Sequence, residues 1–166
     1  MDTSDPHTVS TRALDEVLEP GAILMVGTGP TVMDARPLTA ARVDPQRIDF
    51  LVDGREDWVR SLSEGEPALA TLSDNRSNVW ASLRGSSTTS ADPALIDELW
   101  SPPASAFFED GRDTPGITAF SIRVHEGRWW ASPAGRAGSL LSMVRAAVGG
   151  ADGAGDHGQV DVGAYR

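Results

Sequence analysis

The sequence has no cysteine and no lysine, and each absence excludes whole classes of chemistry. Without cysteine there is no disulfide, thiolate nucleophile, iron–sulfur cluster or cysteine-ligated zinc. Without lysine there is no Schiff base, no lysine-held pyridoxal cofactor and no Walker-type phosphate loop. The 14 basic residues are therefore all arginines, and any anion must be bound by guanidinium groups, hydroxyls or backbone amides.

Long apolar runs and net positive charge are also missing. The longest clean apolar stretch, Ala22–Val26, is far shorter than the roughly 18 residues that cross a membrane. The 24 acidic residues give a net charge of −10, so most of the surface repels nucleic-acid phosphates and anionic lipids. The polar, acidic residues 1–10 do not resemble a secretory signal. We therefore expect a cytoplasmic protein that binds neither nucleic acid nor a membrane.

The 166 residues suit one domain, and the 40% hydrophobic fraction is typical of a folded core. We expect a disordered leader over residues 1–10, a domain over 11–148 that ends in a helix at 139–148, and a tail over 149–166. The tail is rich in glycine and aspartate. Such composition indicates a mobile segment.

Within the domain, about six short strands are predicted, with short helices inserted between them. The expected strand segments are 21–27, 31–43, 48–52, 67–72, 79–89 and 117–124, and a turn at Gly127 leads into 128–132. Helical spacing of apolar residues is expected over 11–18, 57–62 and 93–100, the last with Asp92 as N-cap. Because helices and strands do not alternate, a β-barrel decorated by helices fits best.

No residue pattern assigns a catalytic group or a metal site. His7, His125 and His157 do not have a metal-binding spacing. The nucleophile-elbow motif G-x-S-x-G is absent from the sequence. We therefore name no catalytic residue and no metal ligand.

Two features indicate a ligand site. Arg36 precedes Pro37 in a strand-like segment, where proline leaves a gap in the ladder and arginine offers a fork of donors suited to a phosphate. The alternative is a surface arginine on an edge strand. Trp129 and Trp130 are adjacent, so in a strand they face opposite sides, and one can fill the core while the other faces a cleft or a partner.

Six segments, in order, resemble the general stress protein branch of the pyridoxamine 5'-phosphate oxidase-like flavoproteins, the FMN-binding split barrels. They are Ala35–Thr39 (ARPLT), Ile48–Leu51 (IDFL), Asp92–Pro102 (DPALIDELWSP), Ala106–Asp113 (AFFEDGRD), Trp129–Pro133 (WWASP) and Gly155–Val162 (GDHGQVDV). The resemblance implies a mainly β protein, a six-stranded antiparallel split barrel. It also implies a homodimer with FMN, a small planar ligand, at the subunit interface, and an FMN-dependent oxidoreductase activity.

The resemblance also places the cofactor-binding residues. They are Arg36, Pro37, Leu38, Thr39, Leu51, Val52, Arg55, Trp58 and Trp130. In the family, an arginine, a threonine and a lysine hold the flavin phosphate. Arg36 matches the arginine, whereas Val52 and Trp58 stand where the family has the threonine and the lysine.

These departures leave other functions open. Asp53 and Glu56 have the spacing of a capping box, which would put carboxylates at the start of the helix where an anion would lie. Arg55 and Arg60 are nearby cations that would offset this charge. The alternatives are a non-enzymatic relative that has lost the flavin phosphate site, and a relative that binds another planar ligand such as a deazaflavin or haem.

Overall fold

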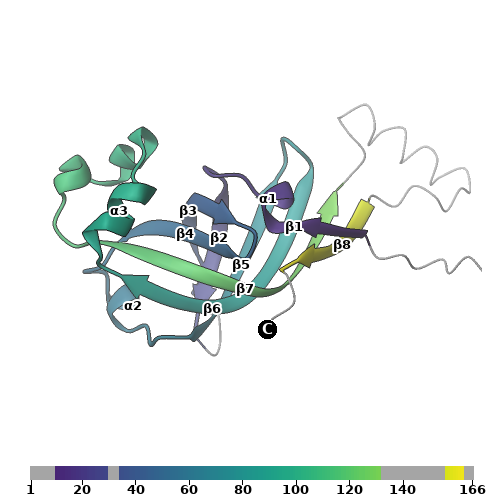
Figure 1. Ribbon diagram of the computed structural model, residues 1–166, viewed down its shortest axis with the longest axis horizontal. Coiled ribbons are helices and arrows are strands. Elements are labelled where there is room, and N and C mark those ends of the chain that lie inside the picture. Colours follow the sequence, from purple (N-terminus) through teal and green to yellow (C-terminus); the bar gives the residue numbers. More distant parts are fainter. Residues whose placement is uncertain (1–9, 30–33, 132–155, 163–166) are drawn as a thin grey trace, which may run out of the picture.

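The computed structural model describes residues 10–29, 34–131 and 156–162, and its centre is a closed barrel of six antiparallel strands (Figure 1). Around the ring the order is β7, β4, β3, β2, β5 and β6, and β6 pairs back onto β7. The strands are β2 (Ile23–Thr28), β3 (Arg36–Asp44), β4 (Arg47–Asp53), β5 (Glu66–Asp74), β6 (Val79–Ser90) and β7 (Ile117–Ala131). The predicted six-stranded barrel is confirmed.

Two further strands extend the sheet beyond the ring, and both correct the sequence predictions. β8 (Asp156–Asp161) pairs antiparallel with β7, and β1 (Ser10–Ala13) pairs parallel with β8. Residues 156–161 are thus not a mobile tail, and only α1 (Leu14–Val17) of the helix expected over 11–18 is helical. Pairing with the end of β7 supplies backbone hydrogen bonds that glycine-rich composition does not reveal. The leader at 1–9 and the helix expected at 139–148 lie outside the described residues.

Strand β7 runs without a break through the position where a turn was expected at Gly127. In its ladder with β6, Gly85 pairs with Val124 and Arg84 with Glu126, so His125 is an extra residue in a bulge. Gly127 is glycine for a packing reason, since a Cβ there would lie 2.7 Å from Leu83 Cδ2. The predicted turn is therefore wrong, because a strand can keep its ladder through a bulge and a closely packed glycine.

The barrel core is filled by large side chains from several strands. Phe50 of β4 and Phe120 of β7 are fully buried, and their ring centroids are 5.9 Å apart. Trp129, at the other end of β7, is also fully buried, and its Nε1 donates to the carbonyl of Gln159 in β8 at 3.2 Å. The core thus joins the ring to its two-strand extension.

Short helices cover one end of the barrel, opposite the end where β1 and β8 lie (Figure 1). They are α2 (Asp57–Arg60), α3 (Pro93–Leu99) and the 3₁₀ segments η1 (Pro102–Phe107) and η2 (Gly111–Asp113). The predicted cap of α3 is confirmed, since the Asp92 side chain accepts from the Ala94 amide at 3.0 Å. Ile96 of α3, Phe108 and Ile117 form a second apolar cluster, which holds α3 against β7.

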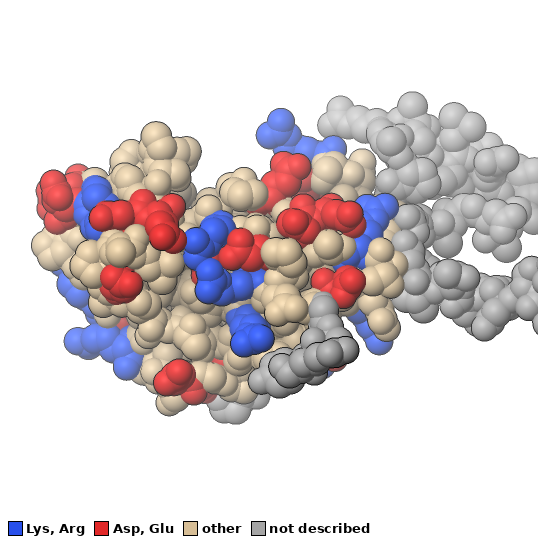
Figure 2. Space-filling model, in the orientation of Figure 1, with Lys and Arg blue, Asp and Glu red and all other residues tan. Residues whose placement is uncertain are grey.

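A buried carboxylate that the sequence analysis missed connects α3 to the barrel wall. Asp49 of β4 is fully buried, and its oxygens lie 2.8 Å from Arg42 Nε and 3.2 Å from Arg47 Nε. Ser121 Oγ also donates to it. Arg42 in turn reaches Glu98 of α3 at 3.3 Å. Arginine and acidic side chains alternate over this face, without a broad patch of one sign (Figure 2).

Within the described residues, no helix has the length and apolar character needed to cross a bilayer.

Candidate functional site

A cavity of about 490 Å³ lies beside β3 and β4, with α2 and η1 forming further walls. Of the nine residues predicted to bind a cofactor, seven line it: Arg36, Pro37, Leu38, Thr39, Leu51, Val52 and Trp58. Strands β3 and β4 are neighbours in the ring, so residues 36–41 and 51–53 come together although a turn separates them. The structure therefore gathers most of the predicted site into one concave surface.

Arg36 is the cation of this cavity. It is the first residue of β3 and is half-buried. Its Nη1 atom is buried, and no described residue accepts a hydrogen bond from it. A buried charged donor without a partner costs roughly 1–3 kcal/mol or more. An anionic group entering the cavity would remove that cost, so Arg36 is suited to bind one.

The ring of Trp58 lies against the guanidinium of Arg36. The Cζ atom of Arg36 is 4.2 Å from the ring centroid, which is a cation–π contact. Trp58 also meets the buried ring of Phe120 edge-on, at 5.5 Å between centroids and 77° between planes. Trp58 is thus fixed by the core on one side and supports Arg36 on the other.

Two carboxylates, Asp53 and Glu56, line the same cavity. The predicted capping box is wrong: Glu56 is itself the N-cap of α2, and no side chain caps that helix. Instead, Asp53 accepts hydrogen bonds from the backbone amide of Arg55 at 2.9 Å and from its Nη2 at 2.7 Å. Helix α2 begins at Asp57, later than an N-cap at Asp53 would require, and Asp53 is used by Arg55.

The side chain of Arg55 hydrogen-bonds to Asp53 and, with the backbone amide, lowers the pKa of that carboxyl. Because the folded pKa is below the unfolded one, the pair contributes to stability above the unfolded pKa and loses that contribution as the pH falls. In an Arg55→Ala variant we expect the pKa of Asp53 to rise toward its ordinary value. A pH titration of the Asp53 carboxyl carbon by NMR measures this.

The control for that titration is Arg60→Ala, because Arg60 pairs with Asp57 at 2.6 Å and not with Asp53. We expect the Asp53 pKa in this control to match that of the wild type. An unchanged Asp53 pKa in Arg55→Ala would show that backbone donors alone hold it low.

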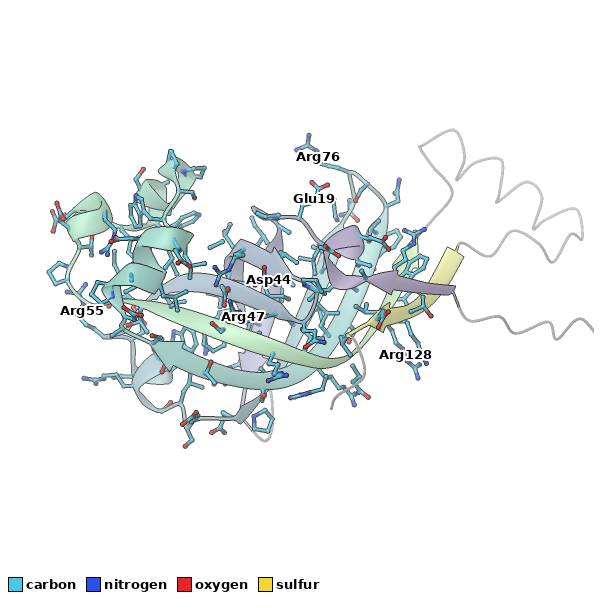
Figure 3. All side chains as sticks on the ribbon, viewed as in Figure 1. Glu19, Asp44, Arg47, Arg55, Arg76 and Arg128 are labelled. Atoms are coloured by element: carbon cyan, nitrogen blue, oxygen red, sulfur yellow. The ribbon has the colours of Figure 1, made fainter. Side chains whose placement is uncertain are left out.

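The other two predicted residues do not line the cavity. Arg55 is engaged by Asp53, and 62% of its side chain is exposed. Trp130 lies in a separate groove with Arg84, His125 and Arg128. Figure 3 shows Arg55 at the helical end of the barrel and Arg128 at the end near β8. One chain therefore does not bring Trp130 to Arg36.

The wall that η1 contributes was not predicted from the sequence. Ser101, Pro103, Ala104, Phe107 and Phe108 line the cavity opposite the strands. Phe107 is 67% exposed, which is unusual for so large an apolar side chain. The double proline and double phenylalanine in this segment were visible in the sequence, but nothing there indicated which strands they would face.

No group of three or more His, Asp or Glu side chains that could hold a metal ion occurs in the ranges 10–29, 34–131 and 156–162.

The sequence matches one protein family over most of its length. The family model described as "Pyridoxamine 5'-phosphate oxidase like" matches residues 10–153. The chain belongs to this family. Among curated proteins, none matches the sequence.

Solved structures share the fold of this pyridoxamine 5'-phosphate oxidase-like protein. A proposed general stress protein 26 from Jannaschia sp. CCS1 is 24% identical with a TM-score of 0.72, over 87% of this chain and 93% of that one. A proposed general stress family protein from Xanthomonas campestris is 25% identical with a TM-score of 0.59, over 69% and 81%. The general stress FMN/FAD binding protein of Xanthomonas citri is 23% identical with a TM-score of 0.61, over 72% and 86%.

Proposed function

We propose that the cavity binds FMN, and that the protein is a homodimeric flavoprotein oxidoreductase. The observation that carries this proposal is the buried Nη1 of Arg36, which no described residue satisfies. A phosphate oxygen would supply the missing acceptor, and charge-assisted hydrogen bonds of this kind contribute roughly 1.5–3 kcal/mol. The Xanthomonas citri relative with the same fold is an FMN/FAD binding protein, which agrees with this assignment.

The walls of the cavity suit the ring of a flavin. Pro37, Leu38, Leu51 and Phe107 give it an apolar lining beside the one arginine. Such a surface shields a planar aromatic ring from water, as small-molecule pockets commonly do. When bound, the flavin supplies the hydride or electron transfer. The chain's own residues bind its anionic end and orient its ring.

The homodimer is part of the same proposal. Ile23 and Met25 of β2 are 61% and 44% exposed, and Met25 pairs with Pro37, which lines the cavity. A second copy covering this face would bury apolar surface next to the ligand. In such a dimer, Trp130 would reach a flavin only from the second copy. Sedimentation analysis should give twice the chain mass, and Met25→Asp should shift the population toward monomer.

The visible absorbance spectrum of freshly purified protein is the first test. We expect flavin bands, or, if the ligand is lost during purification, quenched fluorescence when FMN is added to the colourless protein. The FMN affinity is then obtained from the fluorescence titration. Protein that neither carries a flavin nor quenches FMN at high protein concentration would refute flavin binding.

Asp53 and Glu56 favour a second candidate, a planar ligand without a phosphate. Because both carboxylates line the cavity with Arg36, a doubly charged phosphate meets repulsion as well as attraction. A deazaflavin core, which carries no phosphate, would be bound more tightly than FMN in that case. A parallel titration with riboflavin, a deazaflavin and haemin distinguishes this candidate. Binding of none of them would indicate the non-enzymatic relative.

A further inference from the structure

The orientation of Arg36 is maintained by an aromatic contact and not by an ion pair. Both Asp53 and Glu56 line its cavity, yet no described carboxylate forms a salt bridge with it. Arginine has about 2 kcal/mol of rotamer entropy, so an unsupported side chain would sample many positions. Some of these would place it against the carboxylate of Glu56. The stack with Trp58 at 4.2 Å opposes this movement.

Trp58 is itself well placed to act as a fixed support. Its edge-on contact with Phe120 at 5.5 Å connects it to a side chain that is fully buried in the barrel. A flat guanidinium stacks on an aromatic face with its N–H groups still directed outward in its own plane. The stack therefore covers a face of Arg36 without using the hydrogen-bonding capacity of Nη1.

We infer that Trp58 is a positioning residue that holds Arg36 unpaired and directed into the cavity. As a result, the cavity binds a ring that carries an anionic group more tightly than the same ring without that group. This inference rests on the proposed function, since it concerns the same cavity. It deepens that proposal by assigning the preference for the anionic end to two residues acting together. Trp58 contributes to this preference without needing to contact the anion.

The test compares FMN with riboflavin, which has the same ring without the phosphate. Dissociation constants for both are measured by fluorescence titration for wild type, Trp58→Leu, Arg36→Ala and the double variant. We expect Trp58→Leu to reduce the ratio of FMN to riboflavin affinity by roughly 2- to 30-fold, the range of a cation–π contact. In the Arg36→Ala background, Trp58→Leu should leave the ratio unchanged.

Two variants keep the comparison interpretable. Trp58→Phe retains a ring under Arg36, so we expect it to restore most of the ratio. Trp80→Leu is the matched control, because Trp80 is also half-buried but does not line the cavity, and we expect its ratio to equal the wild-type value. If Trp58→Leu weakened both flavins by one factor, Trp58 would be a general part of the wall and the inference would be wrong.

A readout without flavin separates this inference from the proposed function. The Arg36 Nε–Hε NMR signal is followed while inorganic phosphate is added to wild type and to Trp58→Leu. In the wild type we expect the ring current of Trp58 to shift the Arg36 Nε–Hε signal. In the variant we expect phosphate to bind more weakly. If no flavin binds but this difference is found, only the proposed function fails. If phosphate affects both proteins alike, the positioning role of Trp58 is overturned.

Discussion

Replacing Trp129 by alanine is expected to lower the free energy of unfolding by about 3–5 kcal/mol. Trp129 is fully buried in the barrel core, so the change leaves a cavity that close-packed neighbours fill only in part. It also removes the hydrogen bond to the Gln159 carbonyl and the stack with Arg12, whose Cζ lies 3.9 Å from the ring. Because Gln159 is in β8 and Arg12 in β1, the loss would loosen the two-strand extension as well as the core. Urea unfolding followed by circular dichroism measures the effect.

The adjacent residue provides the control for this experiment. Trp130 has the same chemistry, but 42% of its side chain is exposed. We expect Trp130→Ala to cost less than about 1 kcal/mol, because exposed substitutions away from special features have small effects. Equal destabilisation by the two changes would contradict the division of β7 into an inner and an outer face.

That division is a part of the structure that the sequence predicts well. A strand alternates its side chains, so adjacent tryptophans had to face opposite sides, and their burial confirms it. The same local logic located β2, β4, β5 and the cap of α3, since each depends on a few neighbouring residues. Local patterns of this kind need no knowledge of the rest of the chain.

The features that the sequence did not predict depend on distant partners or on competition between nearby ones. β8 forms because β7 extends past the ring, which glycine-rich composition cannot indicate. Asp53 pairs with Arg55 instead of capping α2, whose N-cap is Glu56. Asp49 is buried because three side chains from β3, β4 and β7 meet there, namely Arg42, Arg47 and Ser121.

The candidate site shows the same limit. Most residues that the resemblance placed at the cofactor site, among them Arg36 and Trp58, line one cavity. The resemblance did not reveal that Trp58 supports Arg36, because the presence of tryptophan in place of lysine does not indicate where the tryptophan ring lies. It also did not reveal the η1 wall, which is more than 40 residues away along the chain.

Removing the guanidinium of Arg36 is expected to weaken FMN binding by roughly 10- to 150-fold, which corresponds to about 1.5–3 kcal/mol for a hydrogen bond to a charged group. Among the described residues that line the cavity, Arg36 is the sole cation; Arg55, which pairs with Asp53, is not part of the lining. After Arg36→Ala, the phosphate would meet Glu56 and the Asp53–Arg55 pair without a cation left to bind it. Fluorescence titration of the variant with FMN measures the loss.

Arg36→Lys distinguishes geometry from charge in this loss. Lysine keeps the positive charge but lacks the planar fork, and it stacks less well on Trp58, so we expect it to recover only part of the affinity. Arg60→Ala removes an exposed arginine that is paired with Asp57, and it should leave the FMN affinity near the wild-type value. If Arg36→Ala bound FMN as tightly as the wild type, the phosphate would have to lie elsewhere. The buried Nη1 of Arg36 would then contribute nothing to FMN binding, because its removal would leave the FMN affinity unchanged.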